Sequence, residues 1–130
     1  MKRDADSRRQ AHLYGLRAEW MAQIYLMAKG YRVLARRYKT KGGEIDLIVM
    51  RGDTIAFVEV KARAKIDDAE IAIDNHKINR IAHAARRWVA LNSWAMKYTL
   101  SGDAIFLAPR RWPRHVANAF TVPVDLYVGR

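Results

Sequence analysis

Three charged residues lie inside two stretches whose other residues are typical of buried β-strands. Asp46 belongs to Gly43-Glu44-Ile45-Asp46-Leu47-Ile48, while Glu59 and Lys61 belong to Phe57-Val58-Glu59-Val60-Lys61. An ionised side chain among apolar neighbours is costly unless it is paired or holds a metal ion. These three residues are therefore the first candidates for chemistry.

The turn between the two stretches predicts how the acidic residues meet. Gly52-Asp53 is typical of a two-residue hairpin loop, so Arg51 should pair with Thr54. The same register places Asp46 directly opposite Glu59 and Glu44 opposite Lys61, with all four side chains on one face. The other face is expected to be apolar and to hold Ile45, Leu47, Val49, Ala56, Val58 and Val60. A strand pair of this kind is covered on both sides.

Two carboxylates opposed across neighbouring strands repel each other, and burial strengthens the repulsion. A divalent cation between Asp46 and Glu59 would turn this repulsion into binding, and oxygen ligands suit Mg²⁺ or Mn²⁺. Lys61 would project beside the same site, where it could orient or help to deprotonate a water molecule, or offset phosphate charge. The alternative is a structural network in which Arg or Lys side chains neutralise both carboxylates.

The net charge of the chain points to a class of partner. Lys and Arg number 24 against 13 Asp and Glu, which gives a formal charge of +11. Such an excess favours a polyanion, above all nucleic acid, through counterion release. Of the two nucleic acids, we expect DNA before RNA. A basic protein that is merely soluble is the alternative.

Length and composition limit the other classes. The 130 residues suit one domain over residues 11–130, preceded by a flexible basic arm over residues 1–10. The absence of cysteine excludes disulfides and thiolate metal sites. No apolar run approaches the roughly 18 residues of a membrane span. We therefore expect a soluble, cytoplasmic protein without membrane contact.

The hydrophobic pattern predicts a mixed sheet between helices, an α/β fold. A helix is expected over residues 11–29, with apolar side chains every three or four positions at Leu13, Leu16, Trp20, Ile24 and Met27. Strands are expected over residues 31–38, 44–50, 54–62 and 103–108. A second helix should start at the N-cap Asp74 and end near Leu91.

Basic and aromatic side chains are candidates for nucleic-acid contacts. The outer face of the second helix and the edge near the hairpin could each follow a phosphate backbone. These positions are Lys77, Arg80, Arg86 and Arg87 on the helix, and Arg36, Arg37, Lys39, Lys41 and Arg63 near the hairpin. Trp88, Trp94 and Trp112 could stack on bases, although packing in a core or an interface is commoner.

The hairpin residues resemble a known family. Gly43-Glu44-Ile45-Asp46-Leu47-Ile48, followed by Phe57-Val58-Glu59-Val60-Lys61-Ala62-Arg63, is similar to the signature of the YraN family of endonuclease-like proteins. That family belongs to the PD-(D/E)xK, restriction-endonuclease-like superfamily. Weaker matches extend over most of the chain at Gly15, Glu19, Ala22, Gly30-Tyr31, Lys77 and Asn118-Ala119-Phe120. A departure is Ser101-Gly102-Asp103, where the family often has Arg-Phe-Asp before its fourth strand.

The resemblance implies a restriction-endonuclease-like core and metal-dependent hydrolysis of phosphodiester bonds in DNA, including branched or single-stranded structures. Asp46 and Glu59 would bind Mg²⁺ or Mn²⁺ together with the Val60 carbonyl, and Lys61 would be the catalytic lysine. Glu19 corresponds to the helical carboxylate that completes the site in junction-resolvase-like relatives; the alternative is a solvated helix carboxylate. Many nucleases of the superfamily act as dimers, so a homodimer is also implied.

Two other readings stay open beside the nuclease. One is a nucleic-acid-binding module, or a nuclease-like subunit that needs a partner; the intact acidic pair and lysine argue against it. The other is a basic structural protein whose strand charges form only ion pairs.

Overall fold

The computed structural model describes residues 16–63 and 73–122, so the predicted arm over residues 1–10 lies outside the described part. Residues 16–28 are helical. The elements that follow are β1 (Arg32–Thr40), β2 (Gly43–Arg51), β3 (Thr54–Ala62), α3 (Asn75–Leu91), the short 3₁₀ helix η1 (Ser93–Lys97), β4 (Thr99–Leu107) and β5 (Arg114–Phe120). Within these ranges, no helix is both long and apolar enough to cross a membrane.

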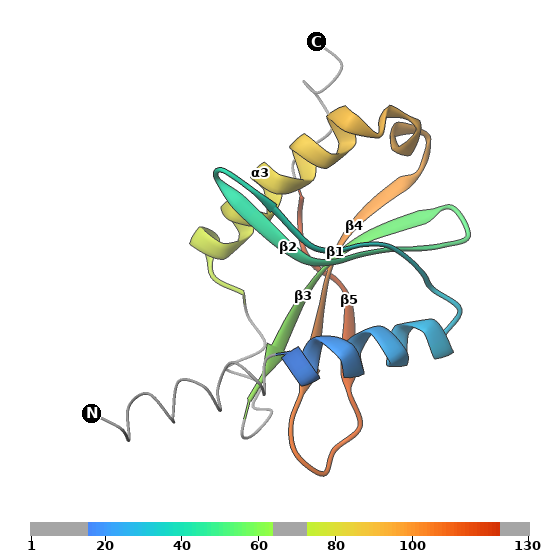
Figure 1. The fold of residues 1–130 in the computed structure, drawn as a ribbon, viewed down its shortest axis with the longest axis vertical. Helices are drawn as coiled ribbons and strands as arrows, with labels where there is room; N and C mark the ends of the chain where they lie inside the picture. Colours follow the sequence, from blue (N-terminus) through green and yellow to red (C-terminus); the bar gives the residue numbers. More distant parts are fainter. Residues whose placement is uncertain (1–15, 64–72, 123–130) are drawn as a thin grey trace.

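The five strands form one mixed sheet in the order β1-β2-β3-β4-β5. Neighbouring strands run antiparallel except β3 and β4, which are parallel and lie on either side of α3 in the sequence. The sheet runs between two helices, with the helix over residues 16–28 on one face and α3 on the other (Figure 1). This is the α/β architecture expected from the sequence, and it is consistent with a restriction-endonuclease-like core.

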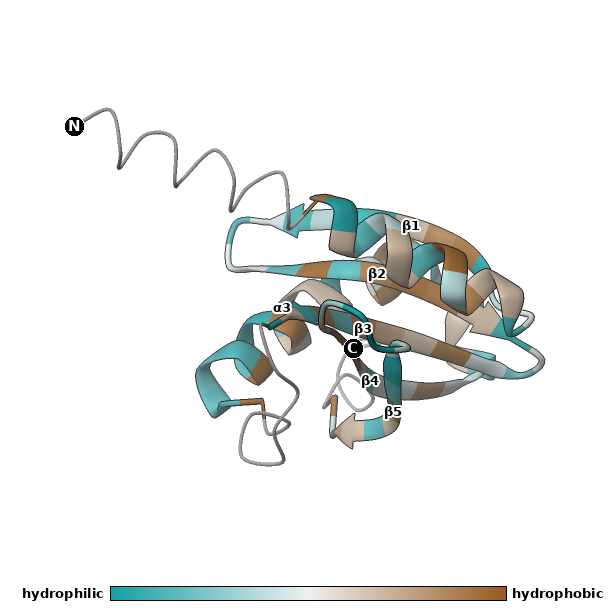
Figure 2. Ribbon diagram, turned by 90° about the horizontal axis from the view of Figure 1, so that it is seen from below, coloured by the Kyte–Doolittle hydropathy of each residue, from teal (hydrophilic) through white to brown (hydrophobic). Residues whose placement is uncertain are grey.

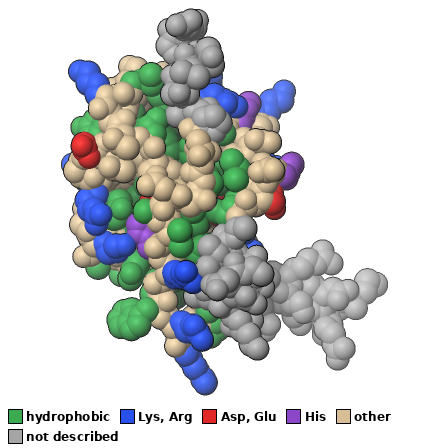
Figure 3. Space-filling view, turned by 180° about the vertical axis from the view of Figure 1, so that it is seen from behind, with side chains coloured by type: hydrophobic (Ala, Val, Ile, Leu, Met, Phe, Trp, Pro, Cys, Tyr) green, Lys and Arg blue, Asp and Glu red, His purple; other side chains and the backbone are tan. Residues whose placement is uncertain are grey.

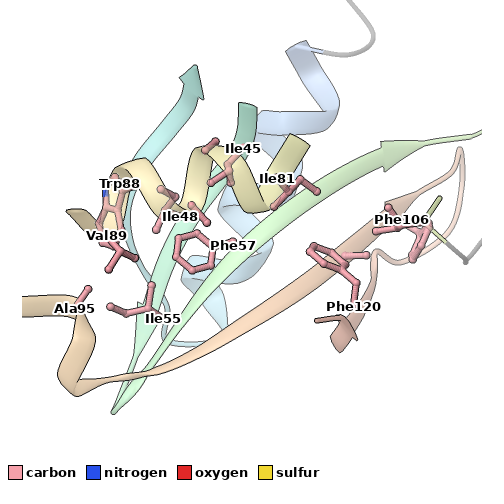
Figure 4. Packing of buried hydrophobic residues seen from close by; sticks show 14 residues of the cluster. Ile45, Ile48, Ile55, Phe57, Ile81, Trp88, Val89, Ala95, Phe106 and Phe120 are labelled. Atoms are coloured by element: carbon pink, nitrogen blue, oxygen red, sulfur yellow. The ribbon is translucent and has the colours of Figure 1, made fainter. Parts of the chain in front are cut away.

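The α3 helix begins and ends where the sequence predicted. The Asp74 carboxylate accepts a hydrogen bond from the Lys77 backbone N–H at 2.8 Å, which caps the first turn. Its buried face packs on Ile45, Ile48 and Phe57 of the sheet, as Figure 4 shows, and the Phe57 and Trp88 rings meet edge to face at 5.9 Å. The first turn of α3 is thereby held over the end of the hairpin.

The helix over residues 16–28 presents a different face to the sheet from the one its large side chains suggested. Ala18, Ala22 and Leu26 are buried, whereas Trp20 is 55% exposed and Ile24 is 62% exposed. The sheet beneath is already filled by its own aliphatic residues, which the central strands carry along much of their length (Figure 2), so small helix residues let the backbones approach. The apolar spacing thus predicted the helix, but the residues that carry the spacing are not the ones that the helix buries.

The start of β2 is in direct contact with α3. A Cβ atom on Gly43 would lie 1.8 Å from the Arg80 carbonyl oxygen, and one on Gly42 would lie 2.8 Å from the His83 ring. No side chain can be accommodated at Gly43 without moving the helix. These two glycines let α3 lie close enough for its first turns to reach the charged end of the hairpin.

Candidate active site

The β2–β3 hairpin keeps the predicted register for part of its length. The pairs run from Arg51↔Thr54 to Leu47↔Val58, and Gly52 has the positive φ of 61° that the tight turn requires. The expected pairs Asp46–Glu59 and Glu44–Lys61 are not formed as ladder partners. The two strands stop pairing where the charged residues begin, so the acidic side chains lie at the opening between them.

The side chain of Asp46 takes the place of a strand partner in this opening. Its Oδ2 accepts a hydrogen bond from the Val60 backbone N–H at 2.8 Å. On its other side, Asp46 is missing from the β1–β2 ladder, and so is Arg37, which would lie opposite it. Arg37 has a left-handed φ of 48°, which is uncommon for a non-glycine residue. The strand pair is thus distorted at Asp46.

One consequence corrects the predicted faces of β2. Ile45 and Ile48 both join the cluster beneath α3, whereas Leu47 joins the cluster beneath the helix over residues 16–28. Strict alternation would have put Ile45 with Leu47. The alternation therefore breaks at Asp46, where the Arg37–Asp46 pair is missing from the β1–β2 ladder.

Glu59 is a buried acidic residue that lies beside a second carboxylate. Its side chain is 6% exposed and its carboxylate lies 3.4 Å from the Lys77 ammonium of α3. Burial, the charge of Asp46 and a hydrogen bond with the Asp46 carboxyl raise the pKa of Glu59 to about 8, although Lys77 acts in the opposite direction. Burial and the neighbouring carboxylate therefore both disfavour the charged form of Glu59 when no cation is present.

Glu19 approaches the same pair from the other side of the sheet. With Asp46 it lines a hollow of about 280 Å³ that also includes Trp20, Gln23, Arg36 and Arg37. Burial and the charge of Asp46 raise the pKa of Glu19, while Arg37, at 3.4 Å, partly offsets them. Glu19 is thus a neighbour of Asp46 whose charge Arg37 balances only in part.

A family model described as "Uncharacterised protein family UPF0102" matches residues 18–110. The UPF0102 protein of Methylorubrum extorquens (strain PA1) is 59% identical over 115 residues, which cover 88% of this chain and 90% of that protein. The chain belongs to the UPF0102 family. The UPF0102 protein of Methylocella silvestris is 54% identical over 117 residues, 90% of this chain and 94% of that protein. The one from Bradyrhizobium diazoefficiens is 51% identical over 106 residues, 82% of this chain and 80% of that protein.

The donor set of this UPF0102 chain fits a hard divalent cation. Asp46 and Glu59 offer carboxylate oxygens that repel each other without one, and Mg²⁺ is commonly held by one or two carboxylates together with water and phosphate oxygens. Across residues 16–63 and 73–122, no three Asp, Glu, His or Cys side chains form a cluster that could hold a metal ion. Glu19 and the Val60 carbonyl therefore remain predicted ligands, beside a pair that the fold does bring together.

The predicted catalytic lysine lies on the same strand as Glu59. Lys61 follows Glu59 by two positions on β3, so the two side chains leave the same face of the sheet. It is half-buried, and its backbone is in register with Phe106 of β4. Its place beside the metal ion and its catalytic role stay predictions.

The basic residues predicted to contact nucleic acid fall into different environments. Lys77 faces Glu59 and so belongs to the acidic site, a role that the helical pattern alone did not indicate. Arg80 lies 3.8 Å from Glu44, and Arg36 covers the Trp20 ring at 5.2 Å. The other predicted positions are exposed side chains on β1, on the β1–β2 turn, after β3 and on α3, namely Arg37, Lys39, Lys41, Arg63, Arg86 and Arg87.

A second buried acidic group is Asp103, which the sequence analysis named only in a departure from the family pattern and gave no role. Asp103 is 1% exposed. It accepts hydrogen bonds from Ser101 Oγ at 2.5 Å, from His115 Nε2 at 2.8 Å and from the Asn118 backbone N–H at 3.2 Å. The Ser-x-Asp spacing was the one available signal, since His115 and Asn118 reach Asp103 only through the pairing of β4 with β5.

Proposed function

We propose that this UPF0102 protein is a Mg²⁺- or Mn²⁺-dependent nuclease that hydrolyses phosphodiester bonds of DNA. The observation that carries the proposal is the acidic pair at the opening between β2 and β3. Asp46 and Glu59 are held together there, although burial and the charge of Asp46 raise the pKa of Glu59 to about 8. A structural network would be expected to supply enough cationic partners to keep both groups ionised. Lys77 supplies only part of that charge.

The roles of the residues follow from their places. Asp46 and Glu59 would hold the metal ion, and the hydrogen bond from the Val60 N–H would fix the Asp46 carboxylate. A bound Mg²⁺ would supply a Lewis acid beside the phosphate and the positive charge that the pair lacks. Lys61 would orient the attacking water and stabilise the negative charge that develops on the phosphate oxygens. Lys77 would hold Glu59 in place from α3.

The basic character of the chain supports nucleic acid as the substrate. A charge of +11 on 130 residues attracts a phosphate backbone whatever its sequence. Arg36 and Arg37 line the hollow beside Asp46, so cationic side chains border the acidic pair. The proposal places the protein in the cytoplasm, where DNA is accessible. A homodimer would let two such sites act on two strands.

The test is cleavage of duplex, single-stranded and branched DNA by wild type and by Asp46→Asn, with Mg²⁺, Mn²⁺ or EDTA. The amide can still accept the Val60 N–H bond, so the fold should be retained while metal-dependent cleavage is lost, at least a hundredfold. Asp53→Asn, on the exposed hairpin turn, is the matched control and should cut like wild type.

Undiminished cleavage by Asp46→Asn would reject this site. Salt-sensitive DNA binding by wild type with no cleavage of any substrate would instead favour the binding module, or a subunit that needs a partner.

A further inference from the structure

The loop between β4 and β5 forms one wall of a second hollow. This groove has a volume of about 650 Å³, and its other wall is the helix over residues 16–28. Its lining includes Arg17 and Met21 from the helix, Leu107 from the end of β4, and Arg110, Arg111 and Trp112 from the loop. We call it the Trp112 groove. It lies on the other side of the helix from the hollow that contains Asp46 and Glu19.

The tryptophans of the chain differ sharply in exposure. Trp88 is 5% exposed in the core, and Trp94 packs edge to face against Trp88 and Tyr98. Trp112 is 86% exposed. An indole that contributes this little to the core is free to offer its flat face to a partner, and aromatic faces of this kind bind bases by stacking. Of the three tryptophans suggested by the sequence, Trp112 is the one suited to that role.

The groove is also basic. Arg17, Arg110 and Arg111 line it, and none of the lining residues within residues 16–63 and 73–122 is acidic. Figure 3 shows Lys and Arg side chains gathered beside a projecting hydrophobic group at the lower end of the molecule, the end where Figure 1 places the β4–β5 loop. A basic surface interleaved with an aromatic face is complementary to a nucleic acid strand, whose phosphates and bases alternate in the same way.

The backbone of the loop presents these side chains at a conformational cost. The Arg111 N–H donates to the Ala108 carbonyl at 3.4 Å, so residues 108–111 form a tight turn with Pro109 at its second position. Arg110 follows with a φ of 60°, a conformation that glycine or asparagine adopts more readily. An arginine with this backbone conformation is a candidate for a functional side chain.

The Trp112 groove lies at the end of the parallel strand pair β3–β4, one strand of which carries Glu59 and Lys61. Lys61 is in register with Phe106, Ala62 with Leu107, and the Arg63 N–H donates to the Leu107 carbonyl at 2.8 Å. Leu107 itself lines the groove. The strand that carries Glu59 and Lys61 therefore ends beside the strand that leads directly into the Trp112 loop.

We propose that the Trp112 groove binds an unpaired nucleotide of the substrate. The Trp112 ring stacks on the base, and Arg17, Arg110 and Arg111 contact the neighbouring phosphates. Bases within a duplex are already stacked on both sides, so an isolated exposed indole selects a strand whose bases are free. Resting on the proposed nuclease function, this inference assigns the substrate class: DNA with a single-stranded segment next to the scissile bond.

Binding measured without metal tests the groove separately from cleavage. The probe is a labelled oligothymidylate of about 12 nucleotides, compared with a duplex of the same length by fluorescence anisotropy in EDTA. Trp112→Ala should weaken binding of the single strand roughly tenfold and change duplex binding by less than about twofold. Trp112→Phe, which keeps an aromatic face, should retain most of the affinity. Leu91→Ala removes an exposed apolar side chain at the end of α3 and is the matched control.

The outcomes separate this inference from the proposed function. Equal binding of the single strand by wild type and Trp112→Ala would overturn the groove, even if wild type cuts DNA. A tenfold loss in Trp112→Ala would support the groove, even if wild type cuts nothing. A change of oligomeric state in Trp112→Ala, measured by sedimentation, with unchanged DNA affinity would mean that a second copy of the chain occupies this surface, and would also overturn the proposal.

Discussion

Two buried carboxylates on adjacent strands have pKa values that are shifted in opposite directions. Glu59 on β3 faces α3, while Asp103 on β4 is in register with Val58 and points to the opposite face. Burial raises the pKa of both, and Asp46 raises that of Glu59 further. Hydrogen bonds from His115, Ser101 and Asn118 more than offset burial at Asp103, so its pKa falls below the usual range.

The difference lies in what each carboxylate faces. Asp103 meets three donors and is complete within the protein, as expected of a group that stabilises the fold. Glu59 meets a second carboxylate and one half-exposed lysine. Burial alone therefore does not distinguish a binding site from a structural one. The difference between these two carboxylates is in the number of hydrogen-bond donors and acceptors around each of them.

The largest effect on stability should come from the completed site. Asp103→Asn replaces one acceptor oxygen by a donor that faces His115, which leaves buried groups mismatched, and should lower the free energy of unfolding by about 2–3 kcal/mol. Because the pKa of Asp103 is depressed in the folded state, its contribution is present above the pKa of the unfolded chain and is lost as pH falls through the folded value. Urea unfolding at pH 7 and below pH 4 measures both, with Asp53→Asn as the exposed control. Equal losses of stability in the two variants would mean that the buried hydrogen bonds of Asp103 do not stabilise the fold.

Glu59→Gln should act with the opposite sign. In EDTA, folded Glu59 keeps its proton up to about pH 8, whereas in the unfolded chain it loses it near pH 4.3. Its contribution to stability is therefore full below about pH 4 and declines as pH rises toward 8. The glutamine variant lacks this decline and should be more stable than wild type by at least about 1 kcal/mol at pH 8. Denaturant midpoints across this pH range provide the measurement, and a variant less stable than wild type at pH 8 would contradict the account.

Added Mg²⁺ should distinguish the two sites by a smaller margin. At ten times its dissociation constant, a cation bound only to the folded state adds about 1.4 kcal/mol. Wild type and Asp103→Asn should both gain this increment, whereas Glu59→Gln should gain little, because it has lost a charged ligand. Thermal unfolding in MgCl₂ and in NaCl of matched ionic strength tests this. An equal increase in the stability of Glu59→Gln would show that the cation binds somewhere other than the acidic pair.

The sequence predicted the hairpin well because its turn sets its register. Gly52-Asp53 places Leu47 opposite Val58, and the acidic residues follow from that pairing. It did not predict where the pairing stops. Nor did it predict the left-handed φ of Arg37 opposite Asp46 on β1, because arginine carries no local preference for such a conformation.

Two further features required tertiary information. Trp20 and Ile24 carry the periodic apolar pattern of their helix, but they are exposed. The smaller Ala18 and Ala22 are the residues buried against the sheet. The partners of Asp103 depend on the β4–β5 register, which shifts between Gly102 and Ala104. Spacing along the chain does not encode such a shift. Local patterns thus located the acidic pair but not the second acidic group or the helix face.

The position of Asp46 and Glu59 within a single hairpin has a kinetic consequence. Contacts between residues close in sequence form early in folding, whereas pairing of the parallel strands β3 and β4 must wait for the longer connection through α3 to close. The two carboxylates are therefore brought together before most of the core exists to hold them there. Their repulsion is expected to be felt in the folding transition state, so a divalent cation should accelerate refolding as well as slow unfolding.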